Sequence, residues 1–201
     1  MKNILITQSL YKDFRNNLYS KLEYEWNRYS KKNNFNLWPI NHDINIECLR
    51  NIKFNGIIFS GGNSLYKYSK NNENKLRDKF EKKLLKFFIP TNVPKLFICR
   101  GMQILADFHN IRLFKTNNHV KKNHKIILKD KSILNVNSYH NFVLKNKPTG
   151  FNVLAKHHLD NTIEIMEHKK KRILCLMFHP ERLSFDQKKV DKIFKNFFNL
   201  K

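Results

Sequence analysis

Short, continuous apolar runs that each give way to a helical pattern are the feature of this sequence that most restricts its fold. Residues 3–7, 56–60 and 96–98 are such runs, and residues 35–40 also look extended. Between them, apolar residues recur at helical spacing, first at Phe14, Leu18, Leu22, Trp26 and Tyr29 and again at Leu76, Phe80, Leu84 and Phe87/Phe88. Strands that are apolar throughout are expected in a parallel sheet whose two faces are covered by helices, so the sequence predicts an α/β fold.

The second half of the chain follows a different pattern. From about residue 125 to 175 the apolar runs are shorter and alternate with polar residues, and turn signals such as Pro148-Thr149-Gly150 separate them. This pattern predicts added strands that are partly antiparallel. A final helix is expected with Val190, Ile193, Phe194 and Phe197 on one face, and Ser184 with Gln187 would form its capping box. We see no repeat and no linker, which favours one domain over residues 1–201.

Composition excludes several classes of protein. No apolar run approaches the roughly 18 residues that cross a bilayer, and the N-terminus lacks the features of a signal peptide, so we expect a cytoplasmic protein. The formal net charge is +23. A nucleic-acid partner would explain this charge, but the basic residues are dispersed in a chain rich in Lys, Asn and Ile, as an AT-rich genome would encode. We therefore expect neither a nucleic-acid nor a membrane partner.

Cys99 is the most informative of the three cysteines. It directly follows a predicted buried strand and precedes Arg100-Gly101, where a helical pattern begins. A side chain at such a junction projects above the sheet, and the adjacent helix N-terminus increases the thiolate fraction. Cys48 and Cys175 lack this context, and we expect both to be buried structural cysteines. An odd number of cysteines without short spacings also argues against a disulfide framework or a metal site.

His179 and Glu181 supply what a nucleophilic thiol needs. They occur in Met177-Phe178-His179-Pro180-Glu181, just after an apolar run. Residues two apart in extended chain face the same side, so Glu181 can orient the imidazole while the other ring nitrogen faces the thiol. His-Pro-Glu alone would suggest a surface turn, and its pairing with Cys99 favours catalysis. Oxyanion donors would be backbone N–H groups at Arg100 and at Gly61-Gly62.

Four blocks of sequence together resemble class I glutamine amidotransferase domains. They are Phe59-Ser60-Gly61-Gly62, Ile98-Cys99-Arg100-Gly101-Met102-Gln103, Val136-Asn137-Ser138-Tyr139-His140 and Phe178-His179-Pro180-Glu181. Cys-Arg-Gly-Met-Gln and Val-Asn-Ser-x-His look like the γ-glutamyl hydrolase branch. Within that branch, the short, Lys/Asn-rich chain is similar to the γ-glutamyl-CDP-amidate hydrolases of capsular phosphoramidate biosynthesis. The chain departs from the family pattern at Phe97 and Phe142, where Gly and Gln are usual.

The resemblance implies a doubly wound, mostly parallel sheet with flanking helices and some added antiparallel strands. It implies a Cys99–His179–Glu181 triad, an oxyanion hole from the backbone of Gly62 and Arg100, and no metal or organic cofactor. It also implies substrate-binding positions, which are Gly61, Gln103, Tyr139, His140, Asn141 and Phe142.

Three functions remain open from the sequence. The first is a hydrolase of a small γ-glutamyl conjugate that needs no obligate protein partner, with a nucleotide as one candidate for the group on the γ-glutamyl nitrogen. The second is a glutaminase subunit that passes ammonia to a synthetase. The third is a non-catalytic nucleic-acid binder, which no recognised motif supports. For the first, Lys121, Lys122 and Lys125 are candidate contacts of a diphosphate.

Overall fold

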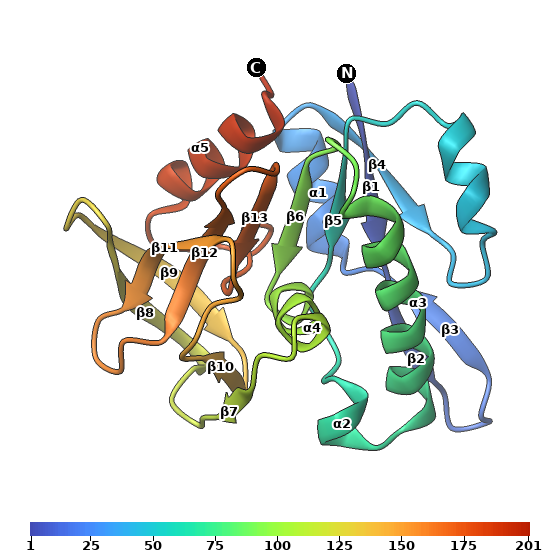
Figure 1. The fold of residues 1–201 in the computed structure, drawn as a ribbon, viewed down its shortest axis with the longest axis horizontal. Helices are drawn as coiled ribbons and strands as arrows, with labels where there is room; N and C mark the ends of the chain where they lie inside the picture. Colours follow the sequence, from blue (N-terminus) through green and yellow to red (C-terminus); the bar gives the residue numbers. More distant parts are fainter.

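A nine-stranded sheet runs through the molecule in the order β4-β1-β5-β6-β13-β12-β11-β8-β9 (Figure 1). The structure is a computed structural model that describes residues 1–201. One part of the sheet is parallel and consists of β4 (Phe35–Ile40), β1 (Lys2–Thr7), β5 (Gly56–Phe59), β6 (Lys95–Ile98) and β13 (Ile173–Leu176). The rest pairs antiparallel and consists of β12 (Ile163–His168), β11 (Phe151–His157), β8 (Val120–Leu128) and β9 (Ile133–Tyr139).

Helices cover both faces of the parallel part, as the apolar runs predict. Side chains of α1 (Tyr24–Lys32) and α5 (Gln187–Phe198) pack with Ile58 in one core, and those of α3 (Asn72–Phe88) and α4 (Arg100–Phe108) pack with Ile57 and Phe59 in the other. Successive strand residues point to opposite faces, which is why a single strand feeds both cores. The α/β fold with a mostly parallel sheet and added antiparallel strands is confirmed.

The smaller elements lie outside the large sheet. They are the hairpin of β2 (Ser9–Lys12) and β3 (Leu18–Lys21), the pair of β7 (Leu113–Lys115) and β10 (Phe142–Leu144), the 3₁₀ helix η1 (Ile46–Asn51) and the short helix α2 (Tyr66–Ser69). No helix combines the length and the apolar character needed to cross a membrane.

The helix expected from Phe14 to Tyr29 is wrong in its first half. The chain forms the β2–β3 hairpin there, and the helix begins only at Tyr24. Asp13 closes the hairpin because its carboxylate accepts hydrogen bonds from the backbone N–H groups of Arg15 and Asn17, both 2.9 Å away. Phe14 is exposed, whereas Trp26 and Tyr29 are buried. The helical spacing of Phe14 with the later residues is therefore coincidental.

Two further expectations need correction. Cys48 lies in η1 and is exposed, whereas Cys175 is buried in the core as expected. The capping box at α5 is only half formed: the side chain of Gln187 accepts from the N–H of Ser184 at 2.8 Å, but the Ser184 hydroxyl instead accepts from Asn137 at 2.8 Å. The helix begins at Gln187 with Asp186 as its N-cap residue and no side-chain cap, so Ser184 lies before the capping position.

Candidate active site

Cys99 occupies a strained position between β6 and α4. Its backbone has φ 48° and ψ −102°, and it is the N-cap residue of α4. A residue with a side chain rarely adopts positive φ, and such strain is concentrated at functional sites. Its N–H donates to the carbonyl of Leu176 on β13 at 2.8 Å, which ties the turn to the sheet. Gly101 permits this path, because a Cβ there would lie 2.1 Å from the carbonyl oxygen of Phe59.

His179 and Glu181 form a buried pair next to Cys99. The Nδ1 of His179 lies 2.7 Å from Oε1 of Glu181, and both side chains are almost fully buried. Burial by itself lowers the pKa of His179, but the Glu181 carboxylate and the Cys99 sulfur raise it to about 10. The Glu181 carboxylate on one side of the ring and the Cys99 sulfur on the other thus both favour the charged imidazole. The structure thus brings Cys99, His179 and Glu181 together, and their roles as nucleophile, base and orienting carboxylate stay a prediction.

Asn137 fixes the backbone of His179. Its Oδ1 accepts from the His179 N–H at 2.9 Å and its Nδ2 donates to the His179 carbonyl at 2.7 Å. The same Nδ2 also donates to the carbonyl of Arg182 at 2.9 Å. Asn137 is buried on β9. Sequence reasoning places this residue in a family motif without giving it a role, and an amide side chain within that motif is the signal that could have found it.

The Gly61-Gly62 loop lies against the histidine. A Cβ on Gly61 would lie 2.4 Å from Cε1 of His179, so only glycine leaves room for the ring. Gly62 has φ +107°, and a Cβ there would meet the Ser9 hydroxyl at 2.5 Å. Arg77, which is fully buried, donates through Nη2 to the carbonyls of Ser60 at 3.0 Å and Gly61 at 2.9 Å. Because Arg77 binds the carbonyl groups of Ser60 and Gly61, the loop can direct its N–H groups away from Arg77.

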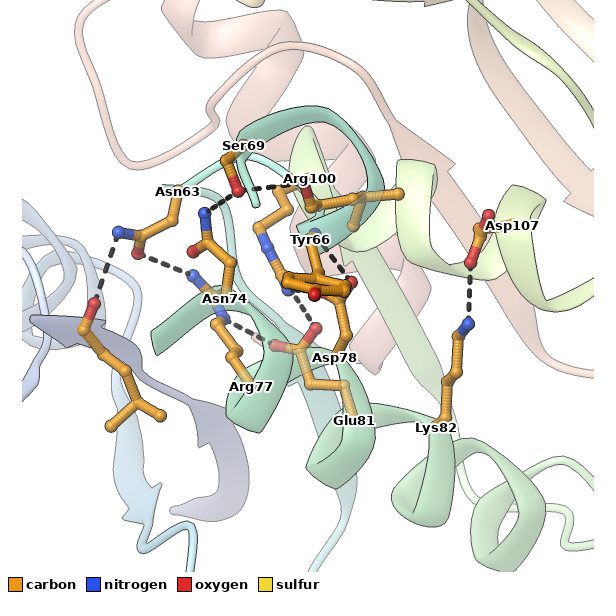
Figure 2. A network of polar contacts seen from close by, with 12 residues as sticks. Asn63, Tyr66, Ser69, Asn74, Arg77, Asp78, Glu81, Lys82, Arg100 and Asp107 are labelled. Atoms are coloured by element: carbon orange, nitrogen blue, oxygen red, sulfur yellow. Dashed lines mark hydrogen bonds and ion pairs between the residues drawn. The ribbon is translucent and has the colours of Figure 1, made fainter. Parts of the chain in front are cut away.

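A buried ion network underlies both this loop and the α4 turn (Figure 2). Arg77 donates to Glu81 at 2.9 Å, and the side chain of Arg100 pairs with Glu81 and Asp78. Burial, together with the charge of Arg100, lowers the pKa of Arg77 to about 10. Sequence reasoning missed Arg77, Asp78 and Glu81, because charged residues on an amphipathic helix normally face solvent. The backbone N–H of Arg100, at the first position of α4, has no partner within the helix.

The predicted substrate-binding residues lie on two neighbouring segments. Gln103 on α4 donates through Nε2 to the carbonyl of Phe142 at 3.2 Å. The Tyr139 ring stands edge-on to His179 with centroids 5.9 Å apart. Asn141 is exposed, whereas the His140 side chain is buried among other histidines. The structure thus brings Gln103 and the 139–142 segment together, and it places Tyr139 beside the histidine of the pair.

A cavity of about 610 Å³ adjoins the His179–Glu181 pair. Its lining includes Tyr139, Glu181, Arg182 and, on α1, Arg28 and Lys32. The Arg182 guanidinium lies 4.3 Å from the centroid of the Tyr139 ring and also pairs with Glu23. The cavity therefore combines cations with an aromatic ring.

Known proteins with similar sequences show which family the chain belongs to. The family described as "Glutamine amidotransferase class-I" matches residues 14–200. A γ-glutamyl-CDP-amidate hydrolase from Campylobacter jejuni subsp. jejuni is 34% identical over 166 residues, which cover 80% of each chain. A glutamine-hydrolysing GMP synthase from a Wolbachia species is 34% identical over 140 residues, which cover 64% of this chain and 26% of that protein.

Solved structures show the same fold. A putative GMP synthase subunit from Thermoplasma acidophilum superposes with a TM-score of 0.73 at 18% identity and covers 99% of this chain and 94% of its own. A glutamine amidotransferase from Thermotoga maritima superposes with a TM-score of 0.66 at 14% identity and covers 98% of this chain and 82% of its own. With a family match across nearly the whole sequence, this chain belongs to the class-I glutamine amidotransferase family.

Proposed function

We propose that this chain is a cysteine hydrolase that cleaves a γ-glutamyl amide, with Cys99, His179 and Glu181 as its catalytic residues. The observation that carries the proposal is the meeting of a strained Cys99 at the start of α4 with the buried His179–Glu181 pair. The Glu181 carboxylate favours the charged form of His179, which lies beside the Cys99 sulfur. A thiolate beside a proton donor suits acyl transfer, in which attack is followed by protonation of the leaving group.

The reaction would proceed in two halves. The Cys99 thiolate attacks the γ-carbonyl carbon and forms a C–S bond, and the carbonyl oxygen becomes an oxyanion that accepts hydrogen bonds from the backbone N–H groups of Gly62 and Arg100. His179 then protonates the amide nitrogen, the C–N bond breaks, and the amine leaves a glutamyl thioester. Neutral His179 next takes a proton from water, which attacks the thioester. Glutamate leaves, and the thiolate and the imidazolium are restored.

We propose γ-glutamyl-CDP-amidate as the substrate, so that the products would be glutamate and cytidine diphosphoramidate for capsular phosphoramidate synthesis. The named relative from Campylobacter jejuni, matched over most of both chains, supports this choice. The cavity beside Glu181 also supports it, since Arg28 offers a cation to a diphosphate there, next to Lys32 and Arg182, which pair with Asp191 and Glu23. The glutamyl end would lie near Gly61, Gln103 and the 139–142 segment.

A glutaminase subunit is the second candidate, because several relatives are GMP synthases. The same catalytic residues would then release ammonia from glutamine for a separate synthetase. Such a subunit would be nearly inactive without its partner, whereas the hydrolase would act alone on a small molecule.

One screen tests both candidates. Glutamate release is measured for the purified chain with glutamine, γ-glutamyl alkylamines and γ-glutamyl nucleotide conjugates. We expect turnover of the nucleotide conjugate without any added protein, and none by Cys99→Ala. Cys175→Ala, which removes a buried thiol from the core, is the matched control and should retain turnover. Equal turnover by wild type and Cys99→Ala would overturn the cysteine mechanism, and activity on glutamine alone that requires a synthetase would favour the glutaminase candidate.

A further inference from the structure

Four buried side chains in the antiparallel part of the sheet converge outside the catalytic residues. They are His119 before β8, His124 on β8, His140 after β9 and Glu164 on β12. One ligand atom from each lies within 4.8 Å of the others. The side chains of His119, His140 and Glu164 are inaccessible to solvent, and that of His124 is 6% exposed. None of them takes part in the proposed reaction through its side chain.

The hydrogen bonds made by this cluster point away from its centre. The Nδ1–H of His140 donates to the carbonyl of Phe142 at 3.2 Å, and the Nε2 of His119 bonds to the Asp160 carboxylate at 2.8 Å. Since a neutral imidazole carries one N–H, the other nitrogen of each ring presents a lone pair. Both lone pairs face Glu164, whose carboxylate oxygens have no hydrogen-bond partner. Lone pairs directed at a buried carboxylate are unfavourable in neutral rings, and a metal cation between them would bind both the nitrogens and the carboxylate.

The distances from the three imidazoles to Glu164 are close to those of a tetrahedral metal centre. The Nδ1 of His119 and the Nε2 of His140 lie 3.7 and 3.6 Å from Oε1 of Glu164, and the Nε2 of His124 lies 3.3 Å from Oε2. These distances exceed a good hydrogen bond. Ligands about 2.0–2.1 Å from a tetrahedral zinc ion are about 3.3–3.4 Å from one another. Asp160 would orient His119, as a carboxylate behind a metal-bound histidine commonly does.

We propose that His119, His124, His140 and Glu164 bind a divalent transition-metal ion, of which zinc fits three imidazoles and a carboxylate best. With four protein ligands the site is structural, since it leaves no position for a substrate. It joins β8, the β9–β10 turn and β12. It also fixes the carbonyl of Phe142, which accepts from both His140 and Gln103, and so supports the segment beside the proposed substrate site.

Metal binding is tested on untagged, chelator-treated protein carrying Cys99→Ala, because the Cys99 thiol and His179 could bind metal themselves. We expect one equivalent of Co²⁺ to give the visible absorption of a tetrahedral site without a sulfur-to-metal charge-transfer band. Zn²⁺ at about a hundredfold excess over its dissociation constant should raise Tm by roughly 5–10 °C. Mass spectrometry of protein purified without chelator should find about one bound metal per chain.

Variants locate the ion. His124→Ala and Glu164→Gln should each abolish the Co²⁺ spectrum and the Zn²⁺-dependent rise in Tm, while His158→Ala, an exposed histidine next to the cluster, should behave like the unaltered protein. If the variants fail to fold, the metal-free Cys99→Ala protein still decides the question. Absence of a tetrahedral spectrum and of any rise in Tm in that protein would overturn the proposal. Equal Co²⁺ spectra and Tm rises in Glu164→Gln and the parent would also overturn it.

Discussion

The side chain of Asn137 forms two hydrogen bonds with the backbone of His179. Its Oδ1 accepts from the His179 N–H at 2.9 Å, and its Nδ2 donates to the His179 carbonyl at 2.7 Å. The histidine therefore depends for its position on a different strand, β9, from the β13 strand that leads to it. This explains why a turn containing Pro180 holds a ring beside Cys99 without help from the regular ladder of the sheet.

Replacing Asn137 should impair chemistry more than binding. Asn137→Ala removes both hydrogen bonds to His179 and allows the ring to shift, and a misplacement of about 1 Å can cost roughly 100-fold in rate. We expect a roughly 10–100-fold lower kcat with little change in KM, and an intermediate loss in Asn137→Asp, which keeps only the acceptor. Asn135→Ala is the control: Asn135 lies on the same strand but bonds to Asp186. An equal loss of kcat in both alanine variants would contradict this role.

Gly61→Ala should disturb the same ring from the opposite side. The new Cβ would lie 2.4 Å from Cε1 of His179, so either the ring or the loop must move. We expect kcat to fall by more than the loss of Tm explains. Gly56→Ala is the matched control, since the Cβ added at position 56 would lie equally close, 2.4 Å, to a carbon of Phe198 in the core. That variant should lose Tm but keep its kcat at temperatures where it is folded, and the reverse pattern would refute the assignment.

The His179–Glu181 pair should make stability depend on pH in a defined direction. The pKa of His179 is about 10 in the folded protein and about 6.5 in an unfolded chain. Because the folded value is higher, the pair stabilises the protein fully below about pH 6.5 and loses this contribution as the pH rises towards 10. Glu181→Gln should lower the free energy of unfolding by a few kcal/mol near neutral pH, on the order that such a shift implies.

Urea denaturation of wild type and Glu181→Gln between pH 6 and pH 10 checks this expectation. Titrations of other residues are common to both proteins and cancel in the difference between their free energies of unfolding. This difference in free energy should shrink steadily as the pH rises. A difference that is constant or grows with pH would show that the carboxylate does not stabilise a charged imidazole.

Much of the fold follows from the sequence because its physical causes are local. Continuous apolar runs and the Cys99-Arg100-Gly101 junction specify buried strands and a turn from nearby residues alone. Phe97, in a position where the family usually has glycine, still fits, since its ring stacks on Phe59 in the core with centroids 4.5 Å apart. The single-domain organisation and the catalytic and binding roles stay predictions.

What the sequence could not reveal depends on contacts between distant segments. Arg77 and Glu81 occupy a helix that looks amphipathic, and only the packing of α3 against α4 buries them with Arg100. Likewise His119 and Glu164 are 45 positions apart and lack metal-type spacing, yet antiparallel pairing brings them together. Such clusters arise from strand order, which local periodicity does not encode.

The two proposed contacts for a diphosphate can be told apart by kinetics. If the cavity beside Glu181 binds it, Arg28→Ala combined with Lys32→Ala should raise KM for a γ-glutamyl nucleotide conjugate about tenfold or more, as the loss of charge-assisted hydrogen bonds implies. KM for a γ-glutamyl alkylamine, which lacks the phosphates, should not change. Lys121→Ala with Lys122→Ala removes the same charge from β8 and serves as the matched comparison. A raised KM in the second pair alone would move the diphosphate to β8, and an equal rise for both substrates would show that neither pair recognises phosphate.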